Sequence, residues 1–232
     1  MNRVIVITGT RKGLGKMLAE HFLGIDDVVF GCSRRNSSIT HANYKHFSLD
    51  VSSEKEVIAM VRSIYKTTKR IDILINNAGA ASMNHFLLTP FSTVEKLFAT
   101  NYFGTFLMCR EVSKLMIRQK AGRIINYSTV AVPLKLEGEL VYSSSKAAVE
   151  QLTRVLAAEL GQNGITVNTI GPTPIATDLI KNIPDDKIEK LIESQSVKRL
   201  GTFNDLLNVV NFFISPQSDF ITGQTIYLGG IN

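Results

Sequence analysis

A tyrosine and a lysine lie four residues apart in the stretch Tyr142-Ser-Ser-Ser-Lys146, which begins a segment with helical spacing. Residues four apart share one face of a helix, so the phenol and the ammonium group are expected to be neighbours. A free phenol has a pKa of about 10, so a tyrosine that acts as an acid or base near neutral pH needs a nearby cation. The pair predicts acid–base chemistry, with Tyr142 as the reacting group and Lys146 as its helper.

The same spacing occurs at Tyr65 and Lys69. That pair ends the helical segment before the fourth predicted strand, so it faces the amino ends of the strands. Ligands of open α/β sheets bind at the carboxyl ends instead. We therefore expect Tyr65 and Lys69 to be a surface pair.

Two further polar residues support the first pair. Ser128 ends the fifth predicted strand, where its hydroxyl is placed to donate a hydrogen bond to a substrate oxygen; the alternative is a serine of a turn or cap. Asn101 lies inside an apolar helical segment, and a buried amide must find partners. Either a structural hydrogen bond or an ordered water leading toward Lys146 would satisfy it.

A glycine-rich turn follows the first predicted strand, in Thr8-Gly9-Thr-Arg-Lys-Gly13-Leu-Gly15. Residues without Cβ let backbone amides approach a pyrophosphate, and the helix that follows adds the partial positive charge of its N-terminus. The alternative is a loop with structural glycines, but the position of the turn after the first strand of a β-α pattern favours phosphate binding. The predicted cofactor contacts of this turn are Gly9, Arg11, Lys12, Gly13, Leu14 and Gly15.

The second predicted strand ends in Ser33-Arg34-Arg35, where an acidic residue would accept the ribose hydroxyls of NAD. Arg34, together with Arg11 or Lys12, is suited to bind a 2′-phosphate, because a guanidinium group makes paired hydrogen bonds with phosphate. We therefore expect NADP(H) as the cofactor, with Ser33 and Arg34 beside it. The alternative is a solvated arginine pair.

Short apolar runs alternate with segments of helical spacing along the whole chain, which predicts right-handed crossovers in an α/β fold. Only Arg34 to Lys45 join the second and third strands, so a helix there is expected to be a stub or absent. The predicted strands are Val4–Ile7, Val28–Cys32, His46–Leu49, Ile71–Ile75, Arg123–Tyr127, Thr166–Ile170 and Thr225–Leu228, and the predicted helices are 13–23, 53–68, 93–118, 141–161 and 203–214. We expect a doubly wound parallel sheet of about seven strands with helices on both faces, forming a single domain over residues 1–232.

Composition narrows the class of protein. The net charge of +6 comes from scattered Lys and Arg residues without interleaved aromatics, so we expect no nucleic-acid partner. No apolar stretch is long enough to cross a bilayer, and no membrane partner is expected. Cys32 and Cys109 lie in apolar runs without the spacing of a metal site or disulfide framework, so we expect no metal and a cytoplasmic location.

These motifs together resemble the short-chain dehydrogenase/reductases over essentially the whole length of the chain. Further matching pieces are Asp50-Val51, Asn76-Asn77-Ala78-Gly79, Pro172 to Thr177 and Thr222-Gly-Gln224. The resemblance implies a Rossmann-type fold and a carbonyl or alcohol substrate. It implies that Asn101, Ser128, Tyr142 and Lys146 are catalytic. It also implies cofactor contacts by Asp50 at the adenine edge, by Asn77, Ala78 and Gly79 in the cleft, by Lys146 at the nicotinamide ribose and by Thr177 at the carboxamide. Val51, Tyr142 and Pro172 are further expected cofactor contacts.

Within the family, Gly122-Arg-Ile-Ile and Gly164-Ile-Thr-Val-Asn resemble bacterial 3-oxoacyl-[acyl-carrier-protein] reductases, which implies an acyl thioester substrate and a homotetramer. Asn163 stands where those enzymes often carry a basic residue for the carrier. Glu137 and Glu139 either repel an acidic carrier or phosphate at the pocket mouth or are simply solvated. A sugar- or polyol-type carbonyl, and a regulator that binds cofactor without turnover, therefore stay as alternatives.

One departure from the family pattern concerns the loop after the sixth strand. The usual Pro-Gly reads Pro172-Thr173 here, which leaves the backbone path near the nicotinamide open.

Overall fold

The computed structural model describes residues 2–175 and 185–231. Its centre is a seven-stranded parallel sheet in the order β3-β2-β1-β4-β5-β6-β7. Most strands are short runs rich in Val and Ile, as expected for strands covered on both faces, whereas the edge strand β3, Tyr-Lys-His-Phe-Ser, contains neither residue and is only partly buried. The strands are β1 Val4–Thr8, β2 Val28–Ser33, β3 Tyr44–Ser48, β4 Ile73–Asn76, β5 Gly122–Tyr127, β6 Ile165–Gly171 and β7 Thr225–Tyr227. The predicted sheet is confirmed.

Helices connect the strands and cover both faces of the sheet. They are α1 Gly13–Leu23, α2 Glu54–Thr68, α3 Phe91–Phe98, α4 Gly104–Gln119, α5 Ala131–Leu134, α6 Leu140–Leu160, α7 Asp185–Ser194 and α8 Phe203–Ile214. Short 3₁₀ turns lie at Phe86–Leu88, Gly161–Asn163 and Pro216–Ser218. The five predicted segments correspond to α1, α2, α3 together with α4, α6 and α8, whereas α5 and α7 were not predicted.

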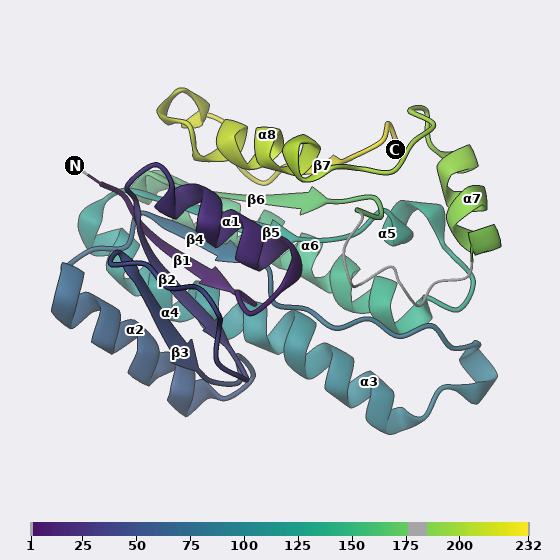
Figure 1. The fold of residues 1–232 in the computed structure, drawn as a ribbon, viewed down its shortest axis with the longest axis horizontal. Helices are drawn as coiled ribbons and strands as arrows, with labels where there is room; N and C mark the ends of the chain where they lie inside the picture. The colour runs from purple at the N-terminus through teal and green to yellow at the C-terminus, as the bar shows by residue number, and fades with distance from the viewer. Residues whose placement is uncertain (1, 176–184, 232) are drawn as a thin grey trace.

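Two apolar cores lie on opposite sides of the sheet. One is formed by the strands with α2, α4 and α6, and the other by the strands with α1 and α8. Figure 1 shows these helices in two layers that sandwich the sheet. Because all strands point the same way, the loops after their carboxyl ends gather at one edge, where the candidate site lies.

The connection between β2 and β3 contains no helix in residues 34–43, as the short spacing predicted. Side chains fill the space instead. The Tyr44 hydroxyl lies 2.9 Å from the Thr10 hydroxyl and 2.9 Å from His46 Nδ1. A Cβ at Gly31 would come within 2.3 Å of the Tyr44 hydroxyl oxygen, so the glycine leaves room for this network. The network ties the third strand to the glycine turn.

The predicted helix over 93–118 is interrupted. A π-helical turn at Ala99–Phe103 separates α3 from α4, and Asn101 is fully buried in it. Such turns hold one residue more than a regular helical turn and often occur at functional sites. The interruption places Asn101 under the loop that follows β4.

Candidate active site

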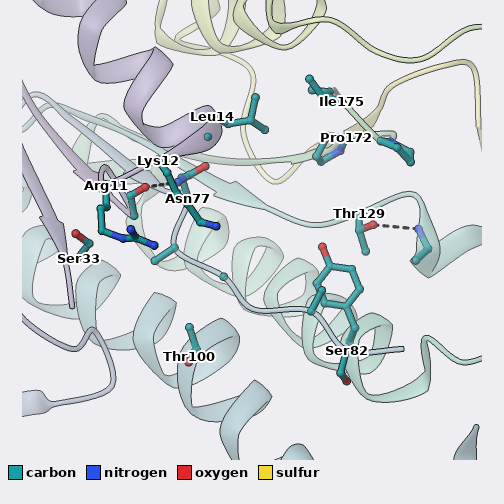
Figure 2. Close-up of a pocket in the computed structure, with 18 of the residues that line it drawn as sticks. Arg11, Lys12, Leu14, Ser33, Asn77, Ser82, Thr100, Thr129, Pro172 and Ile175 are labelled. Atoms are coloured by element: carbon teal, nitrogen blue, oxygen red, sulfur yellow. Dashed lines mark hydrogen bonds between the residues drawn. The ribbon is translucent and has the colours of Figure 1, made fainter. Parts of the chain in front are cut away.

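A cavity of about 1110 Å³ lies along the carboxyl ends of the strands. Figure 2 shows its lining, with Arg11, Lys12, Ser33 and Asn77 toward one end and Thr129, Pro172 and Ile175 toward the other. Of the predicted site residues, the lining contains Gly9, Arg11, Lys12, Gly13, Leu14, Ser33, Arg34, Asp50, Val51, Asn77, Ala78, Gly79, Tyr142 and Pro172. The structure thus brings the glycine turn and Tyr142 to a single cavity.

The glycine turn has a conformation that side chains would prevent. Gly9 and Gly13 have φ angles of 79° and 60°, in the left-handed region that favours glycine. A Cβ at Gly15 would lie 2.4 Å from the Gly9 carbonyl oxygen, so Gly15 supports the turn from beneath rather than lining the cavity. Asn77 holds the turn in place, because its amide donates to the Thr8 carbonyl over 2.9 Å.

Positive charge is concentrated at this end of the cavity. Arg11, Lys12 and Arg34 are exposed there and belong to the lining. The Ser33 hydroxyl donates to the Arg35 carbonyl over 2.7 Å, which folds the chain after β2 back toward the sheet. His46 Nε2 lies 3.1 Å from both the Ser33 hydroxyl and the Arg35 carbonyl. These contacts fix the backbone that carries Arg34.

The residue predicted for adenine binding, Asp50, follows β3 on the same side of the cavity. Its carboxylate accepts hydrogen bonds from the Ser52 amide and hydroxyl over 2.9 and 2.7 Å. Val51 beside it is buried, and a Cβ at Gly104 would clash with its side chain at 2.5 Å. The position of Asp50 in the cavity wall is therefore fixed by local contacts.

Tyr142 lies in the cavity wall on the first turn of α6. Burial raises the pKa of its hydroxyl to about 12, the Thr129 hydroxyl acts in the opposite direction, and the charge of Glu139 adds to the rise. The sequence predicted that Lys146 would lower this pKa. In the structure the loss of solvation dominates, so the neutral phenol, which can donate a proton, is the favoured form.

Lys146 lies one turn further along α6 and is 4% exposed. Its ammonium group donates to the Tyr127 carbonyl over 2.9 Å, and burial lowers its pKa to about 8. It does not line the cavity, but its Nζ lies 3.5 Å from the position that a Cβ would take at Gly79. Gly79 lines the cavity, so only the backbone of this glycine separates the Lys146 ammonium group from the cavity.

Asn101 makes structural hydrogen bonds. Its carboxamide accepts from the Ala80 amide over 2.8 Å and donates to the Ala80 carbonyl and the Ser145 hydroxyl, each over 2.9 Å. Of the two alternatives that the sequence left open, the described contacts fit the structural bond. The residue joins the loop after β4 to α6, close to Tyr142 and Lys146. Its role in a proton relay stays a prediction.

The structure contradicts the prediction for Ser128. Its hydroxyl is 2% exposed, lies outside the cavity lining and donates to the carboxylate of Glu150 on α6. Successive residues of a strand point to opposite faces, and Ser128 continues the face of Asn126, whose amide donates to Thr153 of α6. The next residue, Thr129, lines the cavity, and its hydroxyl affects the pKa of Tyr142. The hydroxyl beside Tyr142 is therefore that of Thr129.

The loop after β6 closes the far end of the cavity. Thr173, the departure from the usual glycine, is 5% exposed, and its hydroxyl donates to Gln195 at the start of the segment after α7. The Gly201 amide donates to the Pro174 carbonyl over 3.1 Å. These bonds fix the path of residues 172–175. Thr177, predicted to contact the carboxamide, lies outside the described residues.

The pair at Tyr65 and Lys69 lies at the end of α2 and is absent from the cavity lining. The Lys69 ammonium group lies 5.7 Å from the centre of the Tyr65 ring. Lys69 is exposed, and the Tyr65 ring is half-buried against the core beneath α2, so the pair lies away from the cavity as predicted, but only Lys69 is fully at the surface.

Glu137 and Glu139 differ in the structure. Glu137 is exposed, whereas Glu139 is 9% exposed and lines the cavity beside Tyr142. The sequence predicted that both residues either repel an acidic group at the pocket mouth or are simply solvated. A buried Glu139 carried no periodic signal, because it lies in a loop before the helix.

Within residues 2–175 and 185–231, no three His, Cys, Asp or Glu side chains gather as a metal site would require. Among the same residues, no helix is both long and apolar enough to cross a membrane.

Comparison with known proteins identifies the family. The family model described as enoyl-(acyl carrier protein) reductase matches residues 10–231. The 3-oxoacyl-[acyl-carrier-protein] reductase FabG of Buchnera aphidicola subsp. Schizaphis graminum is 32% identical, covering 98% of this chain and 96% of the relative. The (2S)-[(R)-hydroxy(phenyl)methyl]succinyl-CoA dehydrogenase subunit BbsD of Thauera aromatica is 33% identical, covering 99% and 96%.

A solved structure extends the similarity to the fold. ElxO with NADP bound has a TM-score of 0.90 and 29% sequence identity, covering 98% of this chain and 97% of that one. The cavity at the sheet edge, the family model and these relatives agree with the resemblance seen in the motifs. The chain belongs to the short-chain dehydrogenase/reductase family and is an NAD(P)-dependent oxidoreductase of alcohol and carbonyl groups.

Proposed function

We propose that this protein reduces a ketone to an alcohol with NADPH, using Tyr142 as the proton donor. The observation that carries the proposal is the continuous cavity, which begins at the glycine turn and its basic residues and ends at Tyr142. One end is suited to phosphates, and the other offers the phenol of Tyr142 as an acid.

The residues of the cavity fit NADP(H). The glycine turn leaves backbone amides open to a pyrophosphate, and a Cβ at Gly13 would meet nothing within 4 Å. Arg11, Lys12 and Arg34 carry the charge that a 2′-phosphate requires. When bound, the cofactor supplies the hydride that adds to the carbonyl carbon. ElxO, which shares the fold, binds NADP, and this supports the same cofactor here.

In the proposed reaction, the O–H bond of Tyr142 breaks and its proton moves to the carbonyl oxygen as the carbon accepts hydride. The raised pKa of Tyr142 keeps the phenol protonated before the reaction. The charge of Lys146 stabilises the tyrosinate that forms, and Thr129 donates a hydrogen bond to the substrate oxygen in the role first assigned to Ser128. Asn101 holds Ala80 and Ser145 in place beside this group.

The substrate class has two candidates. An acyl thioester is supported by the two curated relatives, whose names specify an acyl-carrier-protein and a coenzyme A thioester. A sugar- or polyol-type carbonyl is supported by the buried carboxylate of Glu139 in the pocket, which favours a substrate with hydroxyl groups. The structure adds weight to the second candidate.

The assembly and location are part of the proposal. A homotetramer formed through α4 and α6 is supported by exposed apolar side chains on these helices, Phe106 and Val155, which are 39% and 43% exposed. Buried, unpaired cysteines at positions 32 and 109 fit the proposed cytoplasmic location.

The test is the substitution Tyr142→Phe, assayed as NADPH oxidation over a panel of carbonyl compounds. Loss of the proton donor should lower the rate by at least about a hundredfold, the range of acid catalysis, while NADPH binding stays within a few-fold. Tyr65→Phe is the matched control, because the same change at the surface pair should be silent. Retention of more than about a tenth of the rate in Tyr142→Phe would contradict the assignment. If the wild-type protein binds NADPH but none of the carbonyl compounds in the panel causes NADPH oxidation, the result would favour a regulator that binds cofactor without turnover.

A further inference from the structure

The pocket contains a buried carboxylate that the proposed reaction does not use. Glu139 immediately precedes α6, three residues before Tyr142, and lines the same cavity. Its side chain is 9% exposed, whereas that of Glu137 is exposed and lines a separate surface depression. A glutamate is seldom buried without a partner. Glu139 therefore requires an explanation that Glu137 does not.

The backbone of Glu139 is fully engaged, but its carboxylate is not. Its amide donates to the Leu136 carbonyl over 3.2 Å, and its carbonyl accepts from the Ser143 amide over 2.7 Å. The side chain makes no capping bond to α6. Its Oε2 is buried and has no hydrogen-bond partner among the described residues. An unpaired buried oxygen costs about 1–3 kcal/mol, which a ligand that donates a hydrogen bond would recover.

The charges around Glu139 favour a neutral donor. In the part of the chain that the structure describes, two titratable groups interact electrostatically with Glu139: Lys187 of α7 and Tyr142. Burial raises the pKa of Glu139, and the ammonium group of Lys187 opposes that rise. Because Lys187 already supplies a positive charge, a cationic substrate group is not needed for balance. A hydroxyl group satisfies the oxygen without adding charge.

The geometry points to Glu139 as a specificity-determining residue that accepts a hydrogen bond from a hydroxyl group of the substrate, close to the carbonyl that is reduced. The inference rests on the proposed carbonyl reduction and defines its substrate class as hydroxylated ketones. Glu139 and Tyr142 share one wall of the cavity, so a hydroxyl on a carbon next to the carbonyl lies within reach of the carboxylate when the carbonyl oxygen meets Tyr142.

A 3-oxoacyl thioester fits this wall less well. The two carbons next to its reacting carbonyl carry only hydrogens, and the carbon beyond one of them carries the thioester carbonyl oxygen, so none of these groups is a hydrogen-bond donor. A carboxylate oxygen that a ligand covers but does not satisfy costs binding energy. Sites built to bond a substrate hydroxyl discriminate strongly against analogues that lack it, because their own polar groups are then left unpaired.

The test compares hydroxyacetone with butanone, which differ by a hydroxyl in place of a methyl group and have nearly the same size. In the wild-type protein, kcat/KM with NADPH should be at least about tenfold higher for hydroxyacetone, the value of a hydrogen bond to a charged group. Glu139→Ala should bring the two ketones to within about twofold, mainly by raising KM for hydroxyacetone, and Glu139→Gln should lie between. Glu137→Gln, two residues away and exposed, should keep the full preference.

Three outcomes would overturn the inference: no preference in the wild-type protein, an unchanged preference in both Glu139 variants, or a stronger preference for protonated aminoacetone. NADPH titration by fluorescence checks that each variant is folded, and Glu139→Gln provides the conservative change if Glu139→Ala is unstable. Saturation-transfer NMR with the NADP-loaded protein measures binding of the two ketones without turnover. A binding preference that Glu139→Ala removes supports the inference even if no ketone is reduced, whereas reduction of both ketones without preference refutes the inference and leaves the proposed function standing.

Discussion

The neighbouring hydroxyls of Ser128 and Thr129 have different predicted effects when each is removed. Ser128 donates to the carboxylate of Glu150 beneath the sheet, and Thr129 lines the cavity beside Tyr142. Ser128→Ala should therefore affect stability, and Thr129→Val, which keeps the shape of the side chain, should affect turnover. The two changes lie one residue apart, so each is a control for the other.

The magnitudes follow from the partners. Glu150 retains a bond from the Tyr227 hydroxyl at 2.5 Å and an ion pair with Arg154 at 3.6 Å when Ser128 is shortened. Loss of a single hydrogen bond to a carboxylate then costs about 1.5–2 kcal/mol. In a chain of this size the melting temperature should fall by about 3–8 °C. Loss of a donor to the developing oxyanion in Thr129→Val costs about 3 kcal/mol in the transition state, or about a hundredfold in kcat.

The assay measures melting temperature, NADPH binding and kcat for both variants. Ser128→Ala should keep kcat within about threefold. Thr129→Val creates no cavity but removes the bond that its hydroxyl accepts from the Ala131 amide over 3.2 Å, so it should lower the melting temperature by a few degrees at most while losing turnover. Thr129→Ser, which restores a hydroxyl, should recover most of the rate. The reverse pattern, with turnover lost in Ser128→Ala and retained in Thr129→Val, would refute the placement of the two side chains.

Three further predictions concern pH, cofactor choice and the glycine turn. The pKa of Lys146 is lowered to about 8 and that of Tyr142 is raised to about 12, so kcat for ketone reduction should fall as pH rises through about 8, when Lys146 loses its charge. Lys146→Arg should remove this decrease from the pH profile. A rate that rises through pH 8 would contradict the role of the cation. NADPH should be preferred to NADH by about ten- to a hundredfold, since a charge-assisted bond is worth about 1.5–3 kcal/mol, and Arg34→Asp should reverse the preference through KM. If fluorescence titration gives equal affinities for both cofactors, and Arg34→Asp changes neither, then Arg34 is a solvated surface residue that does not bind the cofactor. Gly15→Ala should weaken NADPH binding at least about tenfold, because its Cβ would lie 2.4 Å from the Gly9 carbonyl oxygen. The Cβ of Gly13→Ala meets nothing within 4 Å, so this variant should lose only the roughly 1–2 kcal/mol of folding free energy that a left-handed backbone costs a residue other than glycine. Equal losses of NADPH affinity in the two variants would show that the contact does not decide the effect.

Much of the fold could be predicted because its signals are local. Apolar β-branched runs such as Val4–Ile7 mark buried strands, and the twelve residues from Arg34 to Lys45 leave little room for a crossover helix. The π-helical turn at Ala99–Phe103 left no such signal. It changes the hydrogen-bond pattern by one residue while the apolar spacing of the helix continues on both sides.

Site residues were predicted correctly where a motif fixes the backbone conformation. They were missed where the direction of a single side chain decides whether it reaches the cavity. The glycine turn and Tyr142 lie where the sequence placed them, because glycine spacing and helical periodicity leave few alternatives. Ser128 and Thr129 are adjacent hydroxyl residues at a strand end, and a shift of one residue exchanges the face to which each points. Glu139 lies in a loop, where no periodic pattern distinguishes a buried side chain from an exposed one.

The π-helical turn before α4 has a consequence for insertions and deletions in this part of the chain. Removing one residue from Ala99–Phe103 would let α3 and α4 join as one regular helix. Since each residue of a helix turns it by about 100°, every side chain before the deletion would then point in a new direction relative to α4. Asn101 would lose its bonds to Ala80 and Ser145, and the loop after β4 would lose its anchor. The length of this turn is therefore fixed more strictly than its sequence, and variation in chain length should be accommodated in the surface loops.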